Sequence, residues 1–434
     1  KKQASIIKNL DFTLTNDQLK SLKEINSDLC ANTKMFRLLQ GDVGSGKTIV
    51  SLISAYNTIN SGFQVALMAP TEILARQHFN LAKKLLPKSV NIRLISGKSE
   101  YRDKKEILNE LSNHEIDIVF GTHAIFQKKV TFKKLGLIII DEQHKFGVNQ
   151  RKKLSDKGGN DCDVLLMTAT PIPRTLTMTI YGDMDLSIIR EKPAARKPIK
   201  TYSKLETKID DVLMFIKKQI ELNNQVFWVC PLIEESKKVD HTSAVKKFEY
   251  LSKAFPNNVG LLHGKTNIED KELILNDFLN NKFKILVSTT IIEVGIDFPN
   301  ANAIVIENAN KFGLSQLHQL RGRVGRGSKQ STCILMFKSN LSENAKKRIN
   351  ILKDSNDGFI ISEEDMKIRG FGDILGFKQS GIKNFKLADP VLNEDLFLLA
   401  EKEMNRIEKS DEDIGKYKPL IKLYDRADII NDIA

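Results

Sequence analysis

The sequence predicts an α/β protein with two tandem parallel-sheet domains and a mainly helical C-terminal extension. Short β-branched or apolar segments alternate with helical segments, and the alternation starts again after a Pro- and Lys-containing stretch at residues 191–200. From residue 343 onward the pattern is mostly helical, interrupted by the glycine-containing stretch 369–381. Because strands that alternate with helices favour parallel pairing, we expect a doubly wound sheet in each of the first two domains. The predicted domain boundaries are 1–192, 193–343 and 344–434.

The strands are predicted from short apolar runs that are bounded by turn residues. In the first domain these runs are residues 36–39, 65–68, 92–95, 116–120, 137–140 and 164–167. Between them, segments 72–86 and 101–111 carry charges on one face, as amphipathic helices do. In the second domain the predicted strands are 225–229, 259–262, 285–288, 303–306 and 332–337.

Composition excludes several classes of protein. Of the 434 residues, 41% are hydrophobic and 28% are charged, which is the balance of a globular protein and not of a disordered or fibrous one. The longest apolar runs, such as 135–140 and 226–230, are far too short to span a bilayer, so no membrane-integral protein is expected. The four cysteines lie far apart, which fits neither a disulfide framework nor a paired-Cys zinc site. We therefore expect a cytoplasmic protein.

The charge balance points to a polyanionic partner. Lys and Arg outnumber Asp and Glu by 67 to 54, which gives a formal net charge of +13. An excess of basic side chains of this size favours binding to nucleic acid. Residues 389–434 contain 12 acidic and 7 basic side chains, so the basic excess belongs to the preceding part of the chain. Any nucleic-acid surface is expected there.

The strongest local pattern is a phosphate-binding loop at residues 41–48, which read Gly-Asp-Val-Gly-Ser-Gly-Lys-Thr between an apolar and a helical segment. Lys47 is expected to reach the β- and γ-phosphates, and Thr48 is expected to ligate Mg²⁺. Backbone N–H groups would face phosphate oxygens along Gly41, Gly44, Ser45 and Gly46. The alternative is a glycine-rich turn that binds nothing. The loop alone leaves open a kinase, a GTPase, a transporter ATPase or a motor.

A pair of carboxylates, Asp141 and Glu142, follows the buried strand predicted at 137–140. Ligands of open α/β sheets bind at this carboxyl edge. Asp141 can complete the shell of the magnesium ion, and Glu142 can orient and deprotonate an attacking water. The plainer alternative is a solvated cap at the end of a strand.

A dense group of arginines marks the second domain, where residues 319–326 read Gln-Leu-Arg-Gly-Arg-Val-Gly-Arg. This density is not expected of a core segment. Arg323 and Arg326 are candidates for fingers that stabilise the charge of a transferring γ-phosphate from the facing domain. The alternative, considered above all for Arg321, is a solvent-facing turn that contacts DNA phosphates. Because a finger completes the site only when the domains close, hydrolysis would be coupled to motion.

Together with further motifs, these patterns resemble the motor part of superfamily 2 helicases and, more narrowly, the RecG family of branch-migration helicases. The resemblance covers essentially the whole chain. It rests on Ala-Pro-Thr-Glu at 69–72, Gly-Thr-His-Ala at 121–124, Asp-Glu-Gln-His at 141–144, Thr-Ala-Thr-Pro at 168–171, His-Gly-Lys at 263–265 and the stretch 288–297.

The resemblance implies two RecA-like (P-loop NTPase) lobes that bind ATP and Mg²⁺ in the cleft between them. The further nucleotide contacts that it implies come from Phe12, Gln18, Gly295, Asp297 and Gln319. The DNA-binding and coupling residues that it implies are Thr71, Arg76, Thr122, His144, Thr168, Thr170, Thr289, Arg348, Arg369 and Gln379. Arg369 and Gln379 belong to a hairpin that, in the family, transmits lobe motion to duplex DNA.

The implied function is that of an ATP-dependent DNA helicase that translocates on duplex DNA, reverses stalled forks and branch-migrates Holliday junctions. Forks, Holliday junctions and duplex arms would be its partners, with single-stranded DNA-binding protein as a further candidate, and it would act as a monomer. RecG proteins also carry an N-terminal wedge domain with an oligonucleotide-binding fold. Since the sequence begins at Lys1 and not at Met, we expect a fragment without that domain.

Two other functions stay open. A transcription-repair coupling translocase is the nearest relative and would engage RNA polymerase, but residues 141–144, 306–309 and 314–319 are the RecG-like versions of their motifs. A nucleotide-switched clamp would bind DNA without translocating.

Isolated histidine and aromatic residues receive simpler interpretations. His78, His114 and His241 are expected to be ordinary surface or helix residues. His144 and His318 lie inside motifs and are expected to bridge the nucleotide and DNA sites. Trp228 lies on a candidate buried strand and is expected in the core, not on a base-stacking surface.

Overall fold

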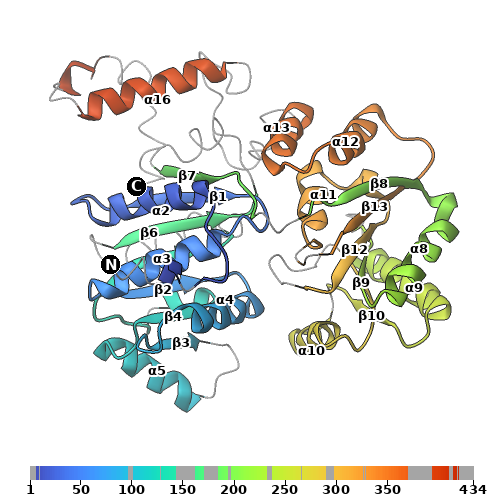
Figure 1. Ribbon diagram of the computed structural model, residues 1–434, viewed down its shortest axis with the longest axis horizontal. Helices are drawn as coiled ribbons and strands as arrows, with labels where there is room; N and C mark the ends of the chain where they lie inside the picture. The colour runs from blue at the N-terminus through green and yellow to red at the C-terminus, as the bar shows by residue number, and fades with distance from the viewer. Residues whose placement is uncertain are drawn as a thin grey trace.

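The structure is a computed structural model of the 434-residue chain. It describes residues 6–8, 10–95, 101–127, 129–142, 162–170, 184–193, 197–231, 237–264, 266–289, 298–325, 327, 329–369, 393–409, 414–417 and 419. Two lobes lie side by side in Figure 1. Lobe 1 comprises the elements α2 to β7, and lobe 2 comprises the elements β8 to α13.

Lobe 1 is a seven-stranded sheet with the order β3-β4-β2-β5-β6-β1-β7, in which every pair of neighbouring strands is parallel. Its strands are β1 (Phe36–Gly41), β2 (Gln64–Met68), β3 (Ile92–Ile95), β4 (Ile118–Gly121), β5 (Leu135–Ile140), β6 (Asp163–Thr168) and β7 (Asp185–Ile189). Its helices are α2 (Asn16–Leu29), α3 (Lys47–Asn60), α4 (Glu72–Leu85), α5 (Tyr101–Asn113) and the 3₁₀ turn η1 (His123–Phe126).

Lobe 2 repeats this design with a parallel six-stranded sheet of order β10-β11-β9-β12-β13-β8. Its strands are β8 (Lys200–Leu205), β9 (Gln225–Val229), β10 (Val259–Leu262), β11 (Ile285–Ser288), β12 (Ala301–Ile306) and β13 (Thr332–Phe337). Its helices and 3₁₀ turns are η3 (Glu206–Lys208), α8 (Ile209–Glu221), α9 (Lys237–Ala254), α10 (Ile268–Leu279), η4 (Ala309–Lys311), α11 (Leu314–Arg321), α12 (Glu343–Asp354) and α13 (Gly358–Arg369).

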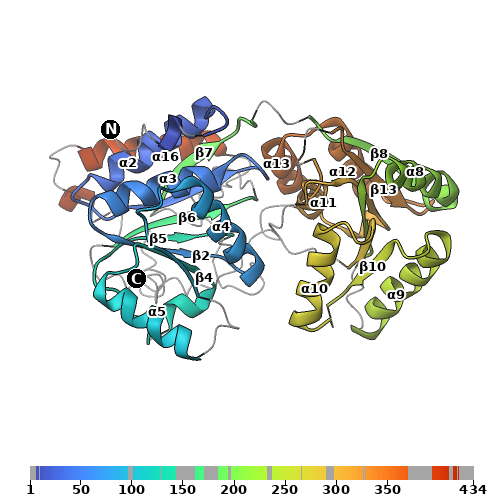
Figure 2. The same ribbon diagram turned by 60° about the horizontal axis from the view of Figure 1, so that its bottom comes forward.

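Helices cover both faces of each sheet, which explains why the central strands are apolar throughout (Figure 2). In lobe 1 one core packs α2, α3 and α4 against the sheet, and another includes residues of α5. In lobe 2 one core packs α10 to α13 against the sheet, and the other packs α8 and α9. Trp228 on β9 is fully buried, so the prediction of a core role is confirmed.

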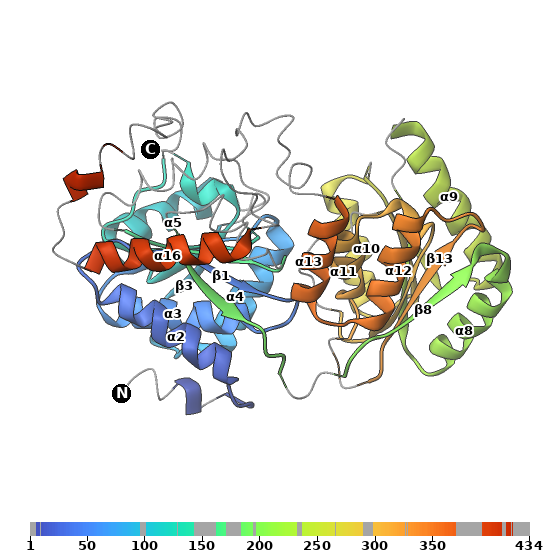
Figure 3. The ribbon, with the colours of Figure 1, turned by 90° about the horizontal axis from the view of Figure 1, so that it is seen from above.

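The C-terminal part is helical where it is described. It contains α13, α16 (Glu394–Lys409) and η5 (Ile414–Tyr417). Figures 1 and 3 both show α13 on the side of lobe 2 that faces lobe 1, and α16 beside lobe 1. Among the helices of the described residues, none combines the length and the apolar character that crossing a membrane requires.

Every predicted strand is present, but two further strands were not predicted. They are β7, which reads Asp-Leu-Ser-Ile-Ile, and β8, which reads Lys-Thr-Tyr-Ser-Lys-Leu and begins inside the expected linker at 191–200. Both are edge strands of their sheets. Edge strands are partly exposed and carry polar residues, so they give no apolar run to detect.

A buried amide ties the start of β2 to its surroundings. The Gln64 side chain is fully buried, and its Nε2 donates to the carbonyls of Leu111 and Ile116, each at 2.9 Å. Its Oε1 accepts from the backbone N–H groups of Lys133 at 2.9 Å and Lys134 at 3.0 Å. One side chain therefore satisfies four buried or half-buried backbone groups, which would otherwise be left without a partner.

The Gln64→Met variant keeps the volume of the side chain and removes these four hydrogen bonds. We expect the free energy of unfolding to fall by about 3 kcal/mol, because each buried backbone group left unpaired costs roughly 1–3 kcal/mol. Urea unfolding followed by circular dichroism measures the change. A loss below about 1 kcal/mol would mean that water replaces the amide.

Candidate nucleotide site between the lobes

The P-loop runs from the end of β1 into the start of α3. Gly44 and Gly46 have φ values of 73° and 87°, which lie in the left-handed region that favours glycine. Gly46 is the N-cap of α3, and no side chain caps this end of the helix, whose first turn contains no acidic residue. Its N–H groups and the positive end of its dipole are therefore suited to an anion such as phosphate.

Gln18 holds the P-loop from α2. Thr15 caps this helix, and the Gln18 Oε1 accepts from the Thr15 backbone N–H at 2.9 Å. The Gln18 Nε2 donates to the Ser45 carbonyl at 2.7 Å. A Cβ atom at Gly46 would overlap this amide. The loop therefore needs glycine at position 46 for space as well as for its backbone angle.

Lys47 lies inside the loop. Its side chain is buried, and Nζ donates to the carbonyls of Gly41 at 2.7 Å and Asp42 at 3.1 Å. Its charge acts on Asp141 and on Glu142 and favours the ionised form of each carboxyl. Lys47 thus sits between the phosphate-binding backbone and the two carboxylates that follow β5.

The pKa values of the neighbouring carboxyl groups of Asp141 and Glu142 are shifted in opposite directions. Burial by itself would raise the pKa of Asp141, but the hydrogen bond with His78 and the charge of Lys47 outweigh it, so the pKa is lowered. His78 Nε2 lies 2.8 Å from Asp141 Oδ2. Burial and the charge of Asp141 raise the pKa of Glu142. Asp141 is therefore held as an anion, whereas Glu142 is suited to accept a proton.

Glu142 also has an uncommon backbone. Its φ is 54°, in the left-handed region, and its side chain is 5% exposed. The Ala169 N–H, which follows β6, donates to Glu142 Oε2 at 3.4 Å. A strained, buried carboxylate at the end of a strand is typical of a functional site.

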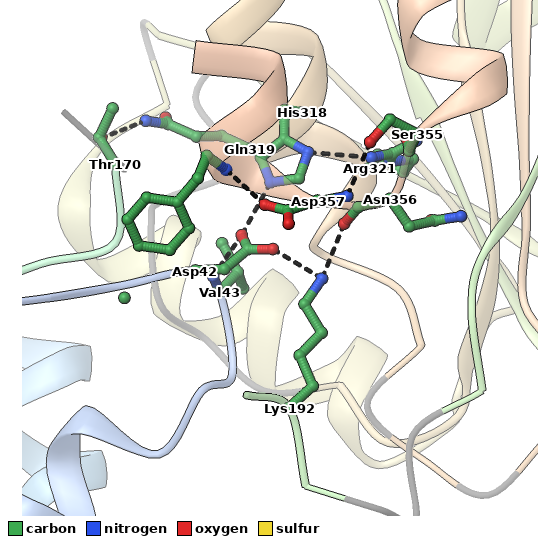
Figure 4. Close-up of polar contacts among 12 residues, drawn as sticks. Asp42, Val43, Thr170, Lys192, His318, Gln319, Arg321, Ser355, Asn356 and Asp357 are labelled. Carbon is green, nitrogen blue, oxygen red and sulfur yellow. Dashed lines mark hydrogen bonds and ion pairs between the residues drawn. The ribbon is translucent and has the colours of Figure 1, made fainter. Parts of the chain in front are cut away.

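Lobe 2 meets this site through α11 and the turn after it (Figure 4). Arg323 is 2% exposed and lies close enough to Glu142 for its charge to act on that carboxyl. The Gln319 Nε2 donates to Thr170 Oγ1 at 2.7 Å. His318 Nε2 lies 2.7 Å from Asp42 Oδ1. The structure thus brings Lys47, Asp141 and Glu142 of lobe 1 together with Arg323 of lobe 2.

Comparison with protein families agrees with this geometry. Residues 15–179 match the family model "DEAD/DEAH box helicase", and residues 207–328 match "Helicase conserved C-terminal domain". Residues 355–424 match "ATP-dependent DNA helicase RecG, domain 3, C-terminal". The chain is therefore similar to RecG proteins over most of its length.

Individual RecG proteins share much of this sequence. The chain is 51% identical to "ATP-dependent DNA helicase RecG" of Bacillus subtilis over 388 residues, which cover 89% of this chain and 57% of that protein. It is 46% identical to the Thermotoga maritima RecG over 396 residues, which cover 91% of this chain and 50% of that protein. The chain therefore spans little more than half the length of these relatives.

Among solved structures, "Structure of RecG bound to three-way DNA junction" is similar with a TM-score of 0.78 and 41% identity, over 91% of this chain and 51% of that one. The helicase Mss116p, bound to single-stranded RNA and AMP-PNP, gives a TM-score of 0.60 at 19% identity over 88% of this chain and 93% of that one. This second similarity shows the fold alone.

The residues that the RecG resemblance assigned to DNA binding mostly follow strands. Thr71 caps α4 after β2, Thr122 follows β4, Thr168 ends β6, and Thr289 follows β11. Arg76 is exposed on α4, and its Nη2 lies 3.5 Å from Glu72 Oε1. Arg348 is on α12, where its Nη1 donates to the Phe312 carbonyl at 2.8 Å. Phe12 is 47% exposed, and Thr48 is in the first turn of α3.

Several predicted site residues lie outside the described residues. These are His144, Gly295, Asp297, Arg326 and Gln379, together with the side chain of Arg369.

One interpretation was wrong, and another was incomplete. Arg321 is 1% exposed, so it is neither a solvent-facing residue nor a contact for DNA phosphates. Its Nη1 donates to the carbonyls of Leu352 at 2.6 Å and Ser355 at 2.9 Å, at the end of α12, and these acceptors stabilise the buried cation. His78 is on a helix, as one part of the prediction stated, but it is buried and forms a hydrogen bond with Asp141.

Sequence reasoning missed Asp42 and Lys192. Lys192 Nζ lies 2.6 Å from Asp42 Oδ2, and the Asp42 side chain is 4% exposed. Asp42 stands at a variable position of the P-loop motif, so the motif assigns it nothing. What marks Asp42 is the burial of an acidic side chain in a loop, and burial is visible in the three-dimensional structure and not in the sequence.

Replacing Glu142 by Gln should stabilise the fold above the ordinary pKa of a glutamate. A carboxyl whose pKa is raised by folding favours the folded state below its unfolded pKa and loses that advantage as pH rises through the folded pKa. We expect Glu142→Gln to raise the free energy of unfolding at pH 8, because the amide removes the cost of burying an ionised carboxylate. The difference should vanish as pH falls toward 4.5, the ordinary value.

Urea titrations at several pH values measure this difference. The exposed Glu269→Gln is the control and should show no such dependence. A Glu142→Gln variant that is less stable than the parent at pH 8 would contradict the raised pKa.

Proposed function

We propose that this chain is the motor of an ATP-dependent DNA helicase, in which ATP and Mg²⁺ bind between the lobes. The observation that supports this most directly is the convergence of Lys47 and Glu142 from lobe 1 with Arg323 from lobe 2. A phosphoryl transfer site needs a cation at the phosphates, a group that orients water and a cation for the charge that develops. These three residues match those three roles.

The residues fit the nucleotide and the metal ion. The uncapped N-terminus of α3 suits the phosphates, and Asp141, whose pKa is lowered, suits a hard cation. No group of three or more metal-ligating side chains occurs in the described part of the chain. This agrees with Mg²⁺, which is commonly held by one or two protein groups and by substrate phosphates. Thr48 and Asp141 are the protein groups proposed, and the bound ion would neutralise phosphate charge.

In hydrolysis, Glu142 would orient the water and accept its proton. Its buried carboxylate accepts a hydrogen bond from the Ala169 N–H, and its backbone lies in the left-handed region. Arg323 would stabilise the charge on the transferring phosphoryl group. Arg326, Gly295, Asp297 and Gln319 are proposed as further contacts from lobe 2.

DNA is proposed to run over the carboxyl ends of the strands in both lobes. The threonines at strand ends and the net charge of +13 support a backbone-directed, salt-sensitive mode of binding. The relative solved with a three-way DNA junction supports branched DNA as the substrate. We propose translocation on duplex DNA, with fork reversal and Holliday-junction branch migration, by a monomer in the cytoplasm. Single-stranded DNA-binding protein is a candidate partner.

The alternatives are separated by simple assays. Displacement of the third strand of a triplex in the presence of ATP distinguishes a motor from a nucleotide-switched clamp. Capture of RNA polymerase by the chain would instead favour a transcription-repair coupling translocase.

Lys47→Ala should lower the ATPase rate at least about 100-fold, because it removes the cation that meets the phosphates. The measurement is the rate of phosphate release with and without forked DNA. The exposed Lys208→Ala serves as the control and should behave like the parent chain. Equal rates in parent and Lys47→Ala would exclude the P-loop as the catalytic site.

Arg369→Ala should spare DNA-stimulated ATP hydrolysis and lower fork reversal, since Arg369 is at the opposite end of α13 from Gly358, which packs on the P-loop residue Asp42. Both activities are measured on the same forked substrate. The exposed Arg406→Ala on α16 is the matched control. Equal losses of hydrolysis and fork reversal would show that Arg369 is no coupling residue.

A further inference from the structure

Asp42 contacts both lobes with different parts of one residue. Its backbone carbonyl accepts from Lys47 Nζ at 3.1 Å, and its side chain faces away from that contact. The carboxylate lies 2.7 Å from His318 Nε2 on α11 and 2.6 Å from Lys192 Nζ in the segment between the lobes. Figure 4 shows these side chains converging on Asp42. The position of the catalytic lysine and the position of α11 are therefore joined through one residue.

The hydrogen bonds define the tautomer of His318. Arg321 Nη2 lies 3.0 Å from His318 Nδ1. A guanidinium has donors only, so His318 Nδ1 accepts and the ring proton is on Nε2. Nε2 then donates to Asp42 Oδ1, and the chain runs with one direction from Arg321 through His318 to Asp42. A side chain at position 318 must accept on one side and donate on the other.

The same cluster reaches the start of α13. Lys192 Nζ donates to the Asn356 carbonyl at 2.9 Å. A Cβ atom at Gly358 would come within 2.7 Å of His318 Nε2 and 2.9 Å of Asp42 Cγ, so the backbone there packs directly on the pair. Arg190 lies over the Phe359 ring at 5.0 Å. The junction of α12 and α13 is thus in contact with the P-loop.

We propose that Asp42, His318 and Lys192 form an interlobe pin, which holds α11 in register with the P-loop and so positions Arg323 beside Glu142. The proposal rests on the proposed ATPase function. The three are positioning residues, because they act through Lys47 and Arg323. Arg323 is only five residues beyond His318, and Gly322 between them packs on Val43, with a closest approach of 3.1 Å for a Cβ atom. Displacing His318 therefore displaces the arginine.

Two substitutions at position 318 test the pin. Gln can accept from Arg321 with its carbonyl and donate to Asp42 with its amide, whereas Leu can do neither. We expect His318→Leu to lower kcat for ATP hydrolysis on forked DNA by about tenfold or more, since small displacements of a catalytic group are costly. His318→Gln should recover most of this rate.

Affinity separates positioning from damage to the fold. Binding of a fluorescent ATP analogue should change less than about threefold in either variant, because the P-loop itself is intact. Lys192→Met removes an ion pair and a hydrogen bond from a partly exposed side chain and should lower kcat in the same direction, with folding checked by circular dichroism. The control Lys247→Met removes an ion pair within lobe 2, to Glu307 at 3.1 Å, and should leave kcat unchanged.

A measurement without hydrolysis tests the pin if the proposed function fails. Cys30 is exposed and the other three cysteines are buried, so Cys30 on lobe 1 and an introduced Leu222→Cys on lobe 2 can carry spin labels. The distance distribution between the labels should be narrow in the parent and in His318→Gln, and broad in His318→Leu. If the parent chain shows this pattern but hydrolyses no ATP, the proposed ATPase function is wrong and the proposed pin is supported.

Two results would overturn the pin. One is a His318→Gln variant as impaired as His318→Leu. The other is a distance distribution that is equally broad, or equally narrow, in the parent and in His318→Leu.

Discussion

The two lobes meet at a buried carboxylate, that of Asp42. Burial by itself would raise the pKa of Asp42, but the hydrogen bond with His318 and the charge of Lys192 lower it, so the group is an anion between the lobes. A buried charge costs several kcal/mol unless it is paired, and the partners of this one come from outside lobe 1. When the lobes separate, water can replace both partners. Such a contact favours docking in one register without making the docked form permanent.

In the proposed nucleotide site, neighbouring groups likewise determine which carboxyl groups are ionised. Asp141 and Glu142 are adjacent in sequence, yet His78 and Lys47 hold the first as an anion while burial favours the protonated form of the second. Two carboxyl groups with separated pKa values can take different roles in one reaction. The arrangement requires His78 on α4, so the helix that begins after Thr71, a proposed DNA contact, also supports the carboxylate proposed to bind the metal ion. The proposed nucleotide and DNA contacts therefore share one helix.

The sequence predicted what local pattern determines. Apolar runs gave the central strands, and the P-loop motif gave the turn from β1 to α3 with Lys47 at its start. The edge strands β7 and β8 were not predicted, because a strand that is exposed on one side can contain polar residues. The roles of His78, Arg321, Asp42 and Lys192 were not predicted, because their partners lie 31 to 276 residues away in the chain. Arginine is seldom buried, but Arg321 is buried because carbonyl groups at the end of a helix accept hydrogen bonds from it.

The two arginines of α11 and its turn illustrate how one motif serves two partners. Arg321 is the last residue of α11, and Arg323 follows two positions later. Arg323 lies in the turn that follows the helix, so its side chain is free of the helical direction that Arg321 follows. Arg321 accordingly meets the end of α12, where its cation also suits the negative end of the helix dipole, while Arg323 meets the cleft. A rotation of α11 within lobe 2 would move Arg321 together with Arg323, and so would change the contacts of Arg321 with Leu352 and Ser355. Arg321 thus links the helix that precedes Arg323 to the junction that leads into α13.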